Sequence, residues 1–447
     1  MTANILRLLT SLIVSDLTNL DRPLPATCAG IMAPQRDQSQ EVVHRPDTDG
    51  YWSHVIIGSL SRLLRFAGYS TDVHAKLCTF VNQVISPAMG APPSLASEGR
   101  IVPVFESFMC DDYSPIELSI LWGKGKPCVR FSIEAISNKD EMARSLGLNM
   151  AASMRLMSTL ESKRLADFTL FKKLMASTTI RCLSESEASA ITSCSVTRSQ
   201  IFFGFDLLYS GDIMVKGYLV PLLRSRLSQC SSFDIIYRAV IDNGLDCRAL
   251  DVIHQYVTGE AYGRDEGLPE PARPEAIILS TDAITQLHAA RLKIYFRFPT
   301  SSFEEILRHL SLGGRTCRLP WIEPLRRCWV ALMKTDPYEN SPAPASGERE
   351  TTTTDCLIYY SFVQGAELPT AKLYIPVRHW CRDDLSISRA VVNLVHSFSG
   401  DETTSSASLY PKLLEDCYPG APLDSSKGRQ TYLCLGRKDD GSFELSM

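Results

Sequence analysis

The chain has 447 residues, of which 45% are hydrophobic and 21% are charged, with a formal net charge of −4. This composition is typical of a globular protein with a large core, and the near-neutral balance excludes a whole-chain attraction to nucleic acid or to an anionic membrane. No apolar run reaches the roughly 20 residues that cross a bilayer. The fourteen cysteines include no C-x-x-C pair, so we expect free thiols in a cytoplasmic protein.

Residues 1–50 are predicted to form an irregular leader without a secretory signal, and residues 51–447 a single domain. Residues 263–274 and 337–354, rich in Pro, Gly, Ser and Glu, are expected to be mobile surface loops. Apolar residues recur at helical spacing in eight segments, which are Val55–Phe66, Ala75–Ile85, Glu141–Ser162, Leu165–Ala176, Phe233–Val257, Phe303–Leu312, Ile322–Lys334 and Ile387–Phe398.

Five pairs of segments rich in β-branched and aromatic residues alternate with these helices. Turn-forming stretches separate the two members of most pairs, so each pair is predicted to form two antiparallel strands. The pairs are Ile116–Trp122 with Cys128–Ile136, Gln200–Leu208 with Ile213–Val220, Ala276–Leu279 with Ala290–Phe298, Cys356–Phe362 with Lys372–Val377, and Thr431–Arg437 with Ser442–Ser446.

The second strand of most pairs carries cations and phenols on one face. Three strands place a lysine two residues before a tyrosine, and these lysines recur at an interval of about 80 residues. Since side chains i and i+2 share a face of a strand, one face is apolar and is made of Val129, Phe131, Val215, Leu292, Ile294, Leu373 and Ile375. The other face collects Arg130, Lys216, Tyr218, Arg291, Lys293, Tyr295, Lys372 and Tyr374, and the last pair adds Tyr432.

Two interpretations of this polar face remain open. It could meet solvent on a half-buried sheet. Alternatively, the strands could close into a barrel whose apolar face is covered by helices and whose lumen receives the cations and phenols. The repetition favours the barrel. Such a lumen could hold a diphosphate by charge-assisted hydrogen bonds of about 1.5–3 kcal/mol each, while the tyrosine rings stabilise a carbocation and exclude water.

Glu117 lies between Ile116 and Leu118 and is therefore predicted to point into the lumen together with Ser119. It could be an ion-pair partner of Arg130. It could also accept the N–H of an indole and so raise the electron density of the attacking ring.

These motifs resemble the fungal dimethylallyl tryptophan synthase family of indole prenyltransferases. The matching stretches, in order, are Leu60–Leu64, Pro115–Ser119, Val129–Phe131, Gly204–Leu207 with Val215–Tyr218, Arg291–Tyr295, Lys372–Tyr374 and Thr431–Leu433. The resemblance implies the α+β ABBA fold, a barrel of ten antiparallel strands with a polar lumen surrounded by helices. It also implies that Glu117 accepts the indole N–H and that the prenyl diphosphate is surrounded by Arg130, Lys216, Tyr218, Arg291, Lys293, Tyr295, Lys372, Tyr374 and Tyr432. A reaction assisted by these side chains requires no metal or other cofactor.

The chain departs from the family pattern in two places. Members that prenylate C4 of tryptophan carry a lysine on the strand before Gly204, whereas Ser199–Phe203 contains none. This favours a larger acceptor, such as a tryptophan-containing cyclic dipeptide, over free tryptophan. The chain also stops at Met447, where relatives continue the last strand, which predicts a weaker closure of the barrel there.

The sequence therefore predicts a metal-independent prenyltransferase that moves a dimethylallyl group from dimethylallyl diphosphate onto an indole, as a monomer or homodimer. The pairs Asp111–Asp112 and Asp383–Asp384 lack the form of a magnesium motif. Phe108, Met109 and Trp122 could line the acceptor pocket, or each could simply be a packing residue. The alternatives are a prenyltransferase of the same fold that acts on a phenol such as tyrosine, and a non-catalytic barrel that binds an anion.

Overall fold

A computed structural model describes residues 50–447 apart from 96–100, 124, 194–196, 246, 260–273, 301, 317–321, 334–354, 399–405, 421 and 438–442. The predicted leader, apart from Gly50, and nearly all of the two predicted surface loops lie outside the described residues.

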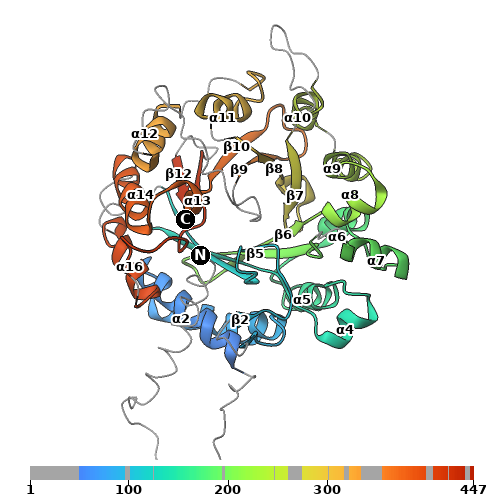
Figure 1. Ribbon diagram of the computed structural model, residues 1–447, viewed down its shortest axis with the longest axis horizontal. Coiled ribbons are helices and arrows are strands. Elements are labelled where there is room, and N and C mark those ends of the chain that lie inside the picture. Colours follow the sequence, from blue (N-terminus) through green and yellow to red (C-terminus); the bar gives the residue numbers. More distant parts are fainter. Residues whose placement is uncertain are drawn as a thin grey trace, which may run out of the picture.

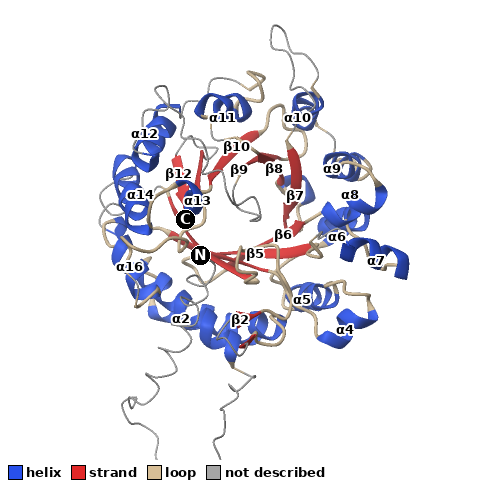
Figure 2. Cartoon of the chain, in the orientation of Figure 1, coloured by secondary structure: helices blue, strands red, loops and turns tan. Residues whose placement is uncertain are grey.

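Ten strands form a closed barrel in which each strand runs antiparallel to both neighbours (Figure 2). They follow one another around the barrel in chain order, and the last pairs with the first. Their bounds are β3 Ile116–Trp122, β4 Cys128–Ile133, β5 Ile201–Leu207, β6 Ile213–Leu219, β7 Glu275–Asp282, β8 Leu292–Phe298, β9 Cys356–Phe362, β10 Thr370–Ile375, β11 Leu433–Arg437 and β12 Phe443–Ser446. The predicted barrel is confirmed, and a separate ribbon joins β1 Ser94–Leu95 to β2 Ile101–Val102.

The barrel closes between β12 and β3. Leu445 lies opposite Trp122 and Ser446 opposite Leu121. Beyond the last strand, Met447 and Ile120 exchange two backbone hydrogen bonds of 2.7 and 3.0 Å. The short final strand is therefore sufficient for closure, contrary to the expectation of a weak seam.

Helices surround the barrel (Figure 1). They are α2 Tyr51–Phe66, α3 Thr71–Phe80, α4 Lys139–Arg144, α5 Ala151–Ser162, α6 Thr169–Thr178, α7 Glu185–Ser193, α8 Leu222–Ser228, α9 Ser232–Ile241, α10 Arg248–Thr258, α11 Phe303–Leu310, α12 Ile322–Met333, α13 Val377–Trp380, α14 Asp384–Phe398 and α16 Tyr410–Cys417. Short π and 3₁₀ turns occupy Val81–Ile85, Ser86–Ala88 and Leu287–Ala289. Among the described helices, none is long and apolar enough to span a membrane.

Two segments predicted as single helices are each divided in two. Residues 141–162 are broken between α4 and α5 because Leu146 and Gly147 both have positive φ, which ends a right-handed helix. Residues 233–257 are broken between α9 and α10, where Gly244 has φ +68°. Polar caps fix the start of the first half of each pair: Asn138 and Glu141 form a capping box on α4, and the Ser231 side chain accepts the backbone N–H of Asp234 in α9.

The core lies between the outer face of the barrel and the helices. All seven side chains predicted for the apolar face are at most 2% exposed and belong to this layer. Trp122 also packs here, edge to face with Tyr410 of α16 at a centroid distance of 5.1 Å. Its predicted place in an acceptor pocket is wrong, because Trp122 shares the outward face of β3 with Leu118 and Ile120.

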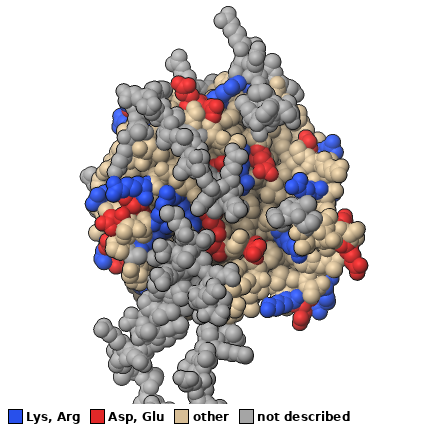
Figure 3. Space-filling model, viewed as in Figure 1, with Lys and Arg blue, Asp and Glu red and all other residues tan. Residues whose placement is uncertain are grey.

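On the face of the molecule in Figure 3, the described basic and acidic side chains are interspersed, as the small net charge predicts.

Candidate active site

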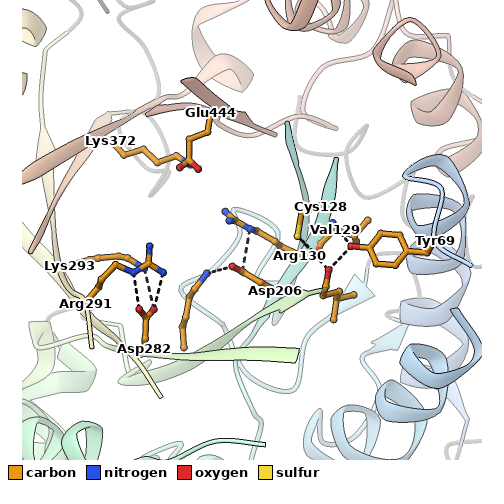
Figure 4. Close-up of polar contacts among 12 residues, drawn as sticks. Tyr69, Cys128, Val129, Arg130, Asp206, Asp282, Arg291, Lys293, Lys372 and Glu444 are labelled. Atoms are coloured by element: carbon orange, nitrogen blue, oxygen red, sulfur yellow. Dashed lines mark hydrogen bonds and ion pairs between the residues drawn. The ribbon is translucent and has the colours of Figure 1, made fainter. Parts of the chain in front are cut away.

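Five basic side chains converge inside the barrel. Figure 4 labels Arg130 of β4, Arg291 just before β8, Lys293 of β8 and Lys372 of β10. The fifth is Lys216 of β6, which is paired with Asp206. The side chains of the three lysines are between 4% and 7% exposed. The repeated Lys-x-Tyr pattern places them there because the intervening residues occupy the apolar outer face. We call this part of the lumen the cation end.

Three carboxylates share the cation end with these side chains. Asp206 Oδ2 lies 2.5 Å from Lys216 Nζ, and Asp206 Oδ1 lies 3.2 Å from Arg130 Nε. Asp282 is 2.8 Å from Arg291 Nε and 3.7 Å from Lys293 Nζ. Glu444 of β12 lies 2.9 Å from Lys372 Nζ. The carboxylates hold the ends of the flexible cations at fixed positions in the lumen (Figure 4).

Among the described residues of the cation end, the five basic side chains outnumber the three carboxylates by two, so these charges do not balance. Burial alone would raise the pKa of Asp206, but Lys216 and Arg130 outweigh it and lower this pKa to about 2. Burial, and then the neighbouring Lys216, lower the pKa of Lys293 to about 7. An enclosed excess of positive charge favours an anionic ligand, whose charge would restore the proton affinity of Lys293.

Two glycines make room for the long side chains of the site. A Cβ on Gly204 of β5 would lie 3.0 Å from the Tyr218 ring and 3.1 Å from its hydroxyl oxygen. A Cβ on Gly436 of β11 would lie 3.1 Å from Lys372, along the path by which this lysine reaches Glu444. Both glycines therefore serve close approach of a side chain.

Tyrosine rings form a layer beside the cations. Tyr295 lies at its centre, with centroids 6.2 Å from Tyr218, 5.0 Å from Tyr359 and 5.9 Å from Tyr374. Tyr432 continues the layer, 6.1 Å from Tyr374. Burial raises the pKa of each of these phenols, so the rings stay neutral. Lys293 Nζ lies 5.9 Å from the Tyr359 centroid, which places the two layers in contact.

Glu117 lies on the inward face of β3, opposite Ser132 of β4. Its side chain is open to the lumen, yet the barrel wall encloses it and this burial raises the pKa of Glu117 to about 7. Arg130 instead pairs with Asp206. The ion pair between Glu117 and Arg130 that the sequence left open is therefore not formed.

An apolar cluster borders the phenol layer on the side away from the cations. It consists of Phe202, Val220, Ile277, Ile278 and Tyr295, with Phe108 and Met109 packed against it. Phe202 stacks on Tyr218 at a centroid distance of 4.5 Å. We call this part of the lumen the acceptor end, after the role that the sequence predicts for Phe108 and Met109; that role stays a prediction.

The sequence profile described as tryptophan dimethylallyltransferase matches residues 48–408 of the chain. The chain belongs to this family. A 4-O-dimethylallyl-L-tyrosine synthase of Claviceps purpurea is 27% identical over 399 residues, which cover 87% of this chain and 84% of that protein. A 7-dimethylallyltryptophan synthase of Aspergillus fumigatus is 26% identical over 417 residues, covering 89% and 84%.

Solved structures agree with this membership of the tryptophan dimethylallyltransferase family. The crystal structure of NotF with brevianamide F and DMSPP superposes with a TM-score of 0.69 at 21% identity, covering 91% of this chain and 95% of that one. AnaPT from Neosartorya fischeri gives a TM-score of 0.70 at 19% identity, covering 87% and 90%. These likenesses establish the fold. Relatives are also named for indole diterpenes and a xanthone, so membership establishes an aromatic prenyltransferase and leaves the acceptor open.

The two acidic pairs have structural partners in this family member. Asp111 lies 3.3 Å from both Arg378 and His379, and the fully buried Asp384 accepts backbone N–H groups of Arg429 and Gln430. Within the part of the chain that the structure describes, no group of three His, Cys, Asp or Glu side chains is arranged to hold a metal ion.

Sequence reasoning missed four residues of the lumen: Tyr359, Asp206, Asp282 and Glu444. Asp206 belongs to a stretch that matches the family and faces Arg130 in the register of β4 and β5. Asp282 was missed because the predicted strand ended at Leu279, whereas β7 continues to Asp282. The signal for Tyr359 was available: of the adjacent Tyr359 and Tyr360, alternation sends one inward and one outward.

Proposed function

We propose that this chain transfers a dimethylallyl group from dimethylallyl diphosphate to the indole ring of tryptophan or, preferentially, of a tryptophan-containing cyclic dipeptide or alkaloid precursor. The bond between C1 of the prenyl group and the diphosphate oxygen breaks and its electrons leave with the diphosphate. A ring atom of the acceptor then bonds to the allylic cation and loses a proton. The observation that carries this proposal is the excess of buried cations directly beside a layer of neutral phenols.

The cation end binds the diphosphate in this scheme. Lys216, Lys293 and Lys372 donate charge-assisted hydrogen bonds to its oxygens, with Arg130 and Arg291 beside them. Negative charge grows on the departing diphosphate, so the same contacts are stronger in the transition state than with the intact substrate and lower the barrier. The scheme uses no metal ion.

The phenol layer stabilises the allylic cation and shields it from water. The ring faces of Tyr218, Tyr295, Tyr359, Tyr374 and Tyr432 can each stabilise a cation by about 0.5–2 kcal/mol. Since their pKa values are raised by burial, the phenols stay protonated and are poor competing nucleophiles. The rings also fill space that water would need in order to reach the cation.

Glu117 orients and activates the acceptor. As a carboxylate it accepts the indole N–H, which delocalises the nitrogen lone pair further into the ring at the moment of attack. Its pKa of about 7 keeps a substantial ionised fraction at neutral pH. The apolar residues of the acceptor end then cover the faces of the ring system.

A phenolic acceptor such as tyrosine is the second candidate. It is favoured by the relative from Claviceps purpurea, which is named as a 4-O-dimethylallyl-L-tyrosine synthase. The chemistry of Glu117 permits it too, because a carboxylate accepts a phenol O–H as readily as an indole N–H.

Incubation of the EDTA-treated protein with dimethylallyl diphosphate and a panel of acceptors tests both candidates. The panel contains tryptophan, tyrosine and tryptophan-containing cyclic dipeptides, and the readouts are diphosphate release and products identified by mass spectrometry and NMR. We expect a prenylated indole, with a cyclic dipeptide turned over faster than tryptophan. Product from tyrosine alone would establish the phenol alternative, and binding of diphosphate without any product would establish a non-catalytic anion-binding barrel.

A further inference from the structure

Glu134 is a buried carboxyl group that the scheme above does not use. It directly follows β4, and the residue is only 1% exposed. Burial raises the pKa of Glu134 to about 7, although three side chains donate hydrogen bonds to it. A buried carboxyl with three hydrogen-bond donors fixes the relative positions of the segments that carry these donors.

The partners of Glu134 come from three separate parts of the chain. Its Oε2 atom accepts hydrogen bonds from Ser107 Oγ at 2.6 Å and Ser199 Oγ at 2.7 Å. Its Oε1 atom accepts one from Asn149 Nδ2 at 3.2 Å, just before α5. The carboxyl thus joins the end of β4, the approach to β5 and the segment before β3.

Each of the two serines also accepts a backbone N–H from the segment before β3. Ser199 Oγ accepts the N–H of Phe108 at 3.0 Å, and Ser107 Oγ accepts the N–H of Met109 at 3.3 Å. Glu134 therefore fixes two consecutive peptide groups through one intermediary each.

The same segment is held at its other end by a second carboxylate. Asp111, with a side chain 3% exposed, lies 3.3 Å from Arg378 and from His379 of α13. Residues 107–111, which we call the strap, thus run between two polar anchors. Between the anchors, Phe108 and Met109 pack against the apolar cluster of the acceptor end.

We propose that Glu134 is a positioning residue for the acceptor, which fixes the strap and thereby sets how the aromatic ring lies against the allylic cation. The inference rests on the proposed function. It assigns to Glu134 an influence on acceptor affinity and on the ring position attacked, without contact between Glu134 and either substrate. The cation end holds no partner of Glu134, so the handling of dimethylallyl diphosphate should be independent of it.

The test compares Glu134→Gln and Ser199→Ala with the wild type and with a matched control, Glu161→Gln. Glutamine keeps the shape of Glu134, but its NH₂ group cannot accept the bond from Asn149. Ser199→Ala is the milder variant and removes one link between Glu134 and the strap. Glu161, like Glu134, is a hydrogen-bonded glutamate that joins separate segments, but its partners Lys172 and Phe168 belong to the helical layer.

Two measurements are made on each protein. The rate of hydrogen–deuterium exchange in a peptide covering residues 103–115 reports how firmly the backbone of the strap is held, and it requires no turnover. Steady-state kinetics give KM for each substrate, and NMR gives the ratio of product regioisomers. For Glu134→Gln and Ser199→Ala we expect faster exchange in this peptide, an acceptor KM raised about 5- to 20-fold, and a KM for dimethylallyl diphosphate within about twofold of the wild type. The regioisomer ratio should also change.

Unchanged exchange in residues 103–115, or an equal rise of both KM values with one unaltered product, would overturn the assignment to Glu134. The same shift in Glu161→Gln would also overturn it, since the effect would then be a general loss of stability. A wild type that prenylates no acceptor would instead refute the proposed function, and the role of Glu134 in acceptor placement would fall with it.

Discussion

The two ends of the lumen are built in different ways. At the cation end, side chains from regular strands face one another across the barrel. Each of the three lysines there is paired with a carboxylate on a different strand. At the acceptor end, the wall includes the strap, which is no strand and is held by Glu134 and Asp111. Under the proposed function, the strand register therefore sets the position of the diphosphate site, whereas loop contacts set the shape of the acceptor site.

This difference indicates which residues can change the specificity for the acceptor. Moving a strand residue by one position would exchange inward and outward side chains throughout that strand and destroy the core. A loop residue can change without that penalty. Relatives named for tryptophan, tyrosine and xanthone substrates are consistent with one common prenyl donor site and variable acceptor sites.

Substitution of Glu117 should give the largest effect and separate the two ends most clearly. We expect Glu117→Ala to lower kcat by about 10²–10⁴-fold, because the acceptor N–H loses its anionic partner. Binding of inorganic diphosphate, measured by calorimetry, should stay nearly unchanged since the cation end is intact. Equal losses of turnover and diphosphate binding would mean that Glu117 supports the barrel itself.

Lys216→Ala and Lys293→Ala should act on the opposite end. Each variant loses a charge-assisted hydrogen bond, so we expect diphosphate to bind about 10- to 100-fold more weakly. Lys172→Ala, which removes an ion pair in the helical layer, is the control and should bind normally. Wild-type affinity in both lumen variants would contradict a diphosphate site at the cation end.

The pH profile of kcat/KM should report one group from each end. Glu117 has a raised pKa of about 7, so its ionised fraction declines as the pH falls through that value, and activity should fall about tenfold per unit below about pH 6. Lys293 has a lowered pKa of about 7, so the empty lumen loses this cation above that pH and activity should fall there too. Lys293→Arg keeps its charge at all these pH values and should remove the basic limb. An unchanged basic limb in this variant would exclude Lys293 as its source.

Gly204→Ala should produce the smallest effect. The added Cβ meets the Tyr218 ring at 3.0 Å, so we expect a loss of about 1–3 kcal/mol in the free energy of unfolding, measured with urea. Gly58→Ala is the matched control, because its Cβ would meet only Arg62 at 3.7 Å within α2 and should stabilise the helix by about 0.5–1 kcal/mol. If both variants were equally stable, the position of Tyr218 would not depend on the missing Cβ.

Much of the barrel could be predicted because apolar and polar residues alternate along the strands. Arg130 and Lys293 lie inside as expected, since each stands between two apolar residues that the helices cover, and Lys216 follows the covered Val215. The extent of β7 could not be predicted in the same way, because Ser280–Asp282 is polar and reads as a turn. The breaks at Leu146 and Gly244 were also missed, since helical periodicity continues on both sides of each break.

The sequence by itself determined which side chains face inward and which family the chain resembles, because both follow from local periodicity and short motifs. Only the tertiary structure decided the partners: Asp206 for Arg130 and Lys216, Glu444 for Lys372, and Glu134 for the strap. These contacts join residues that are up to 76 positions apart (206 − 130 = 76). They depend on strand register and barrel closure, which no local pattern encodes.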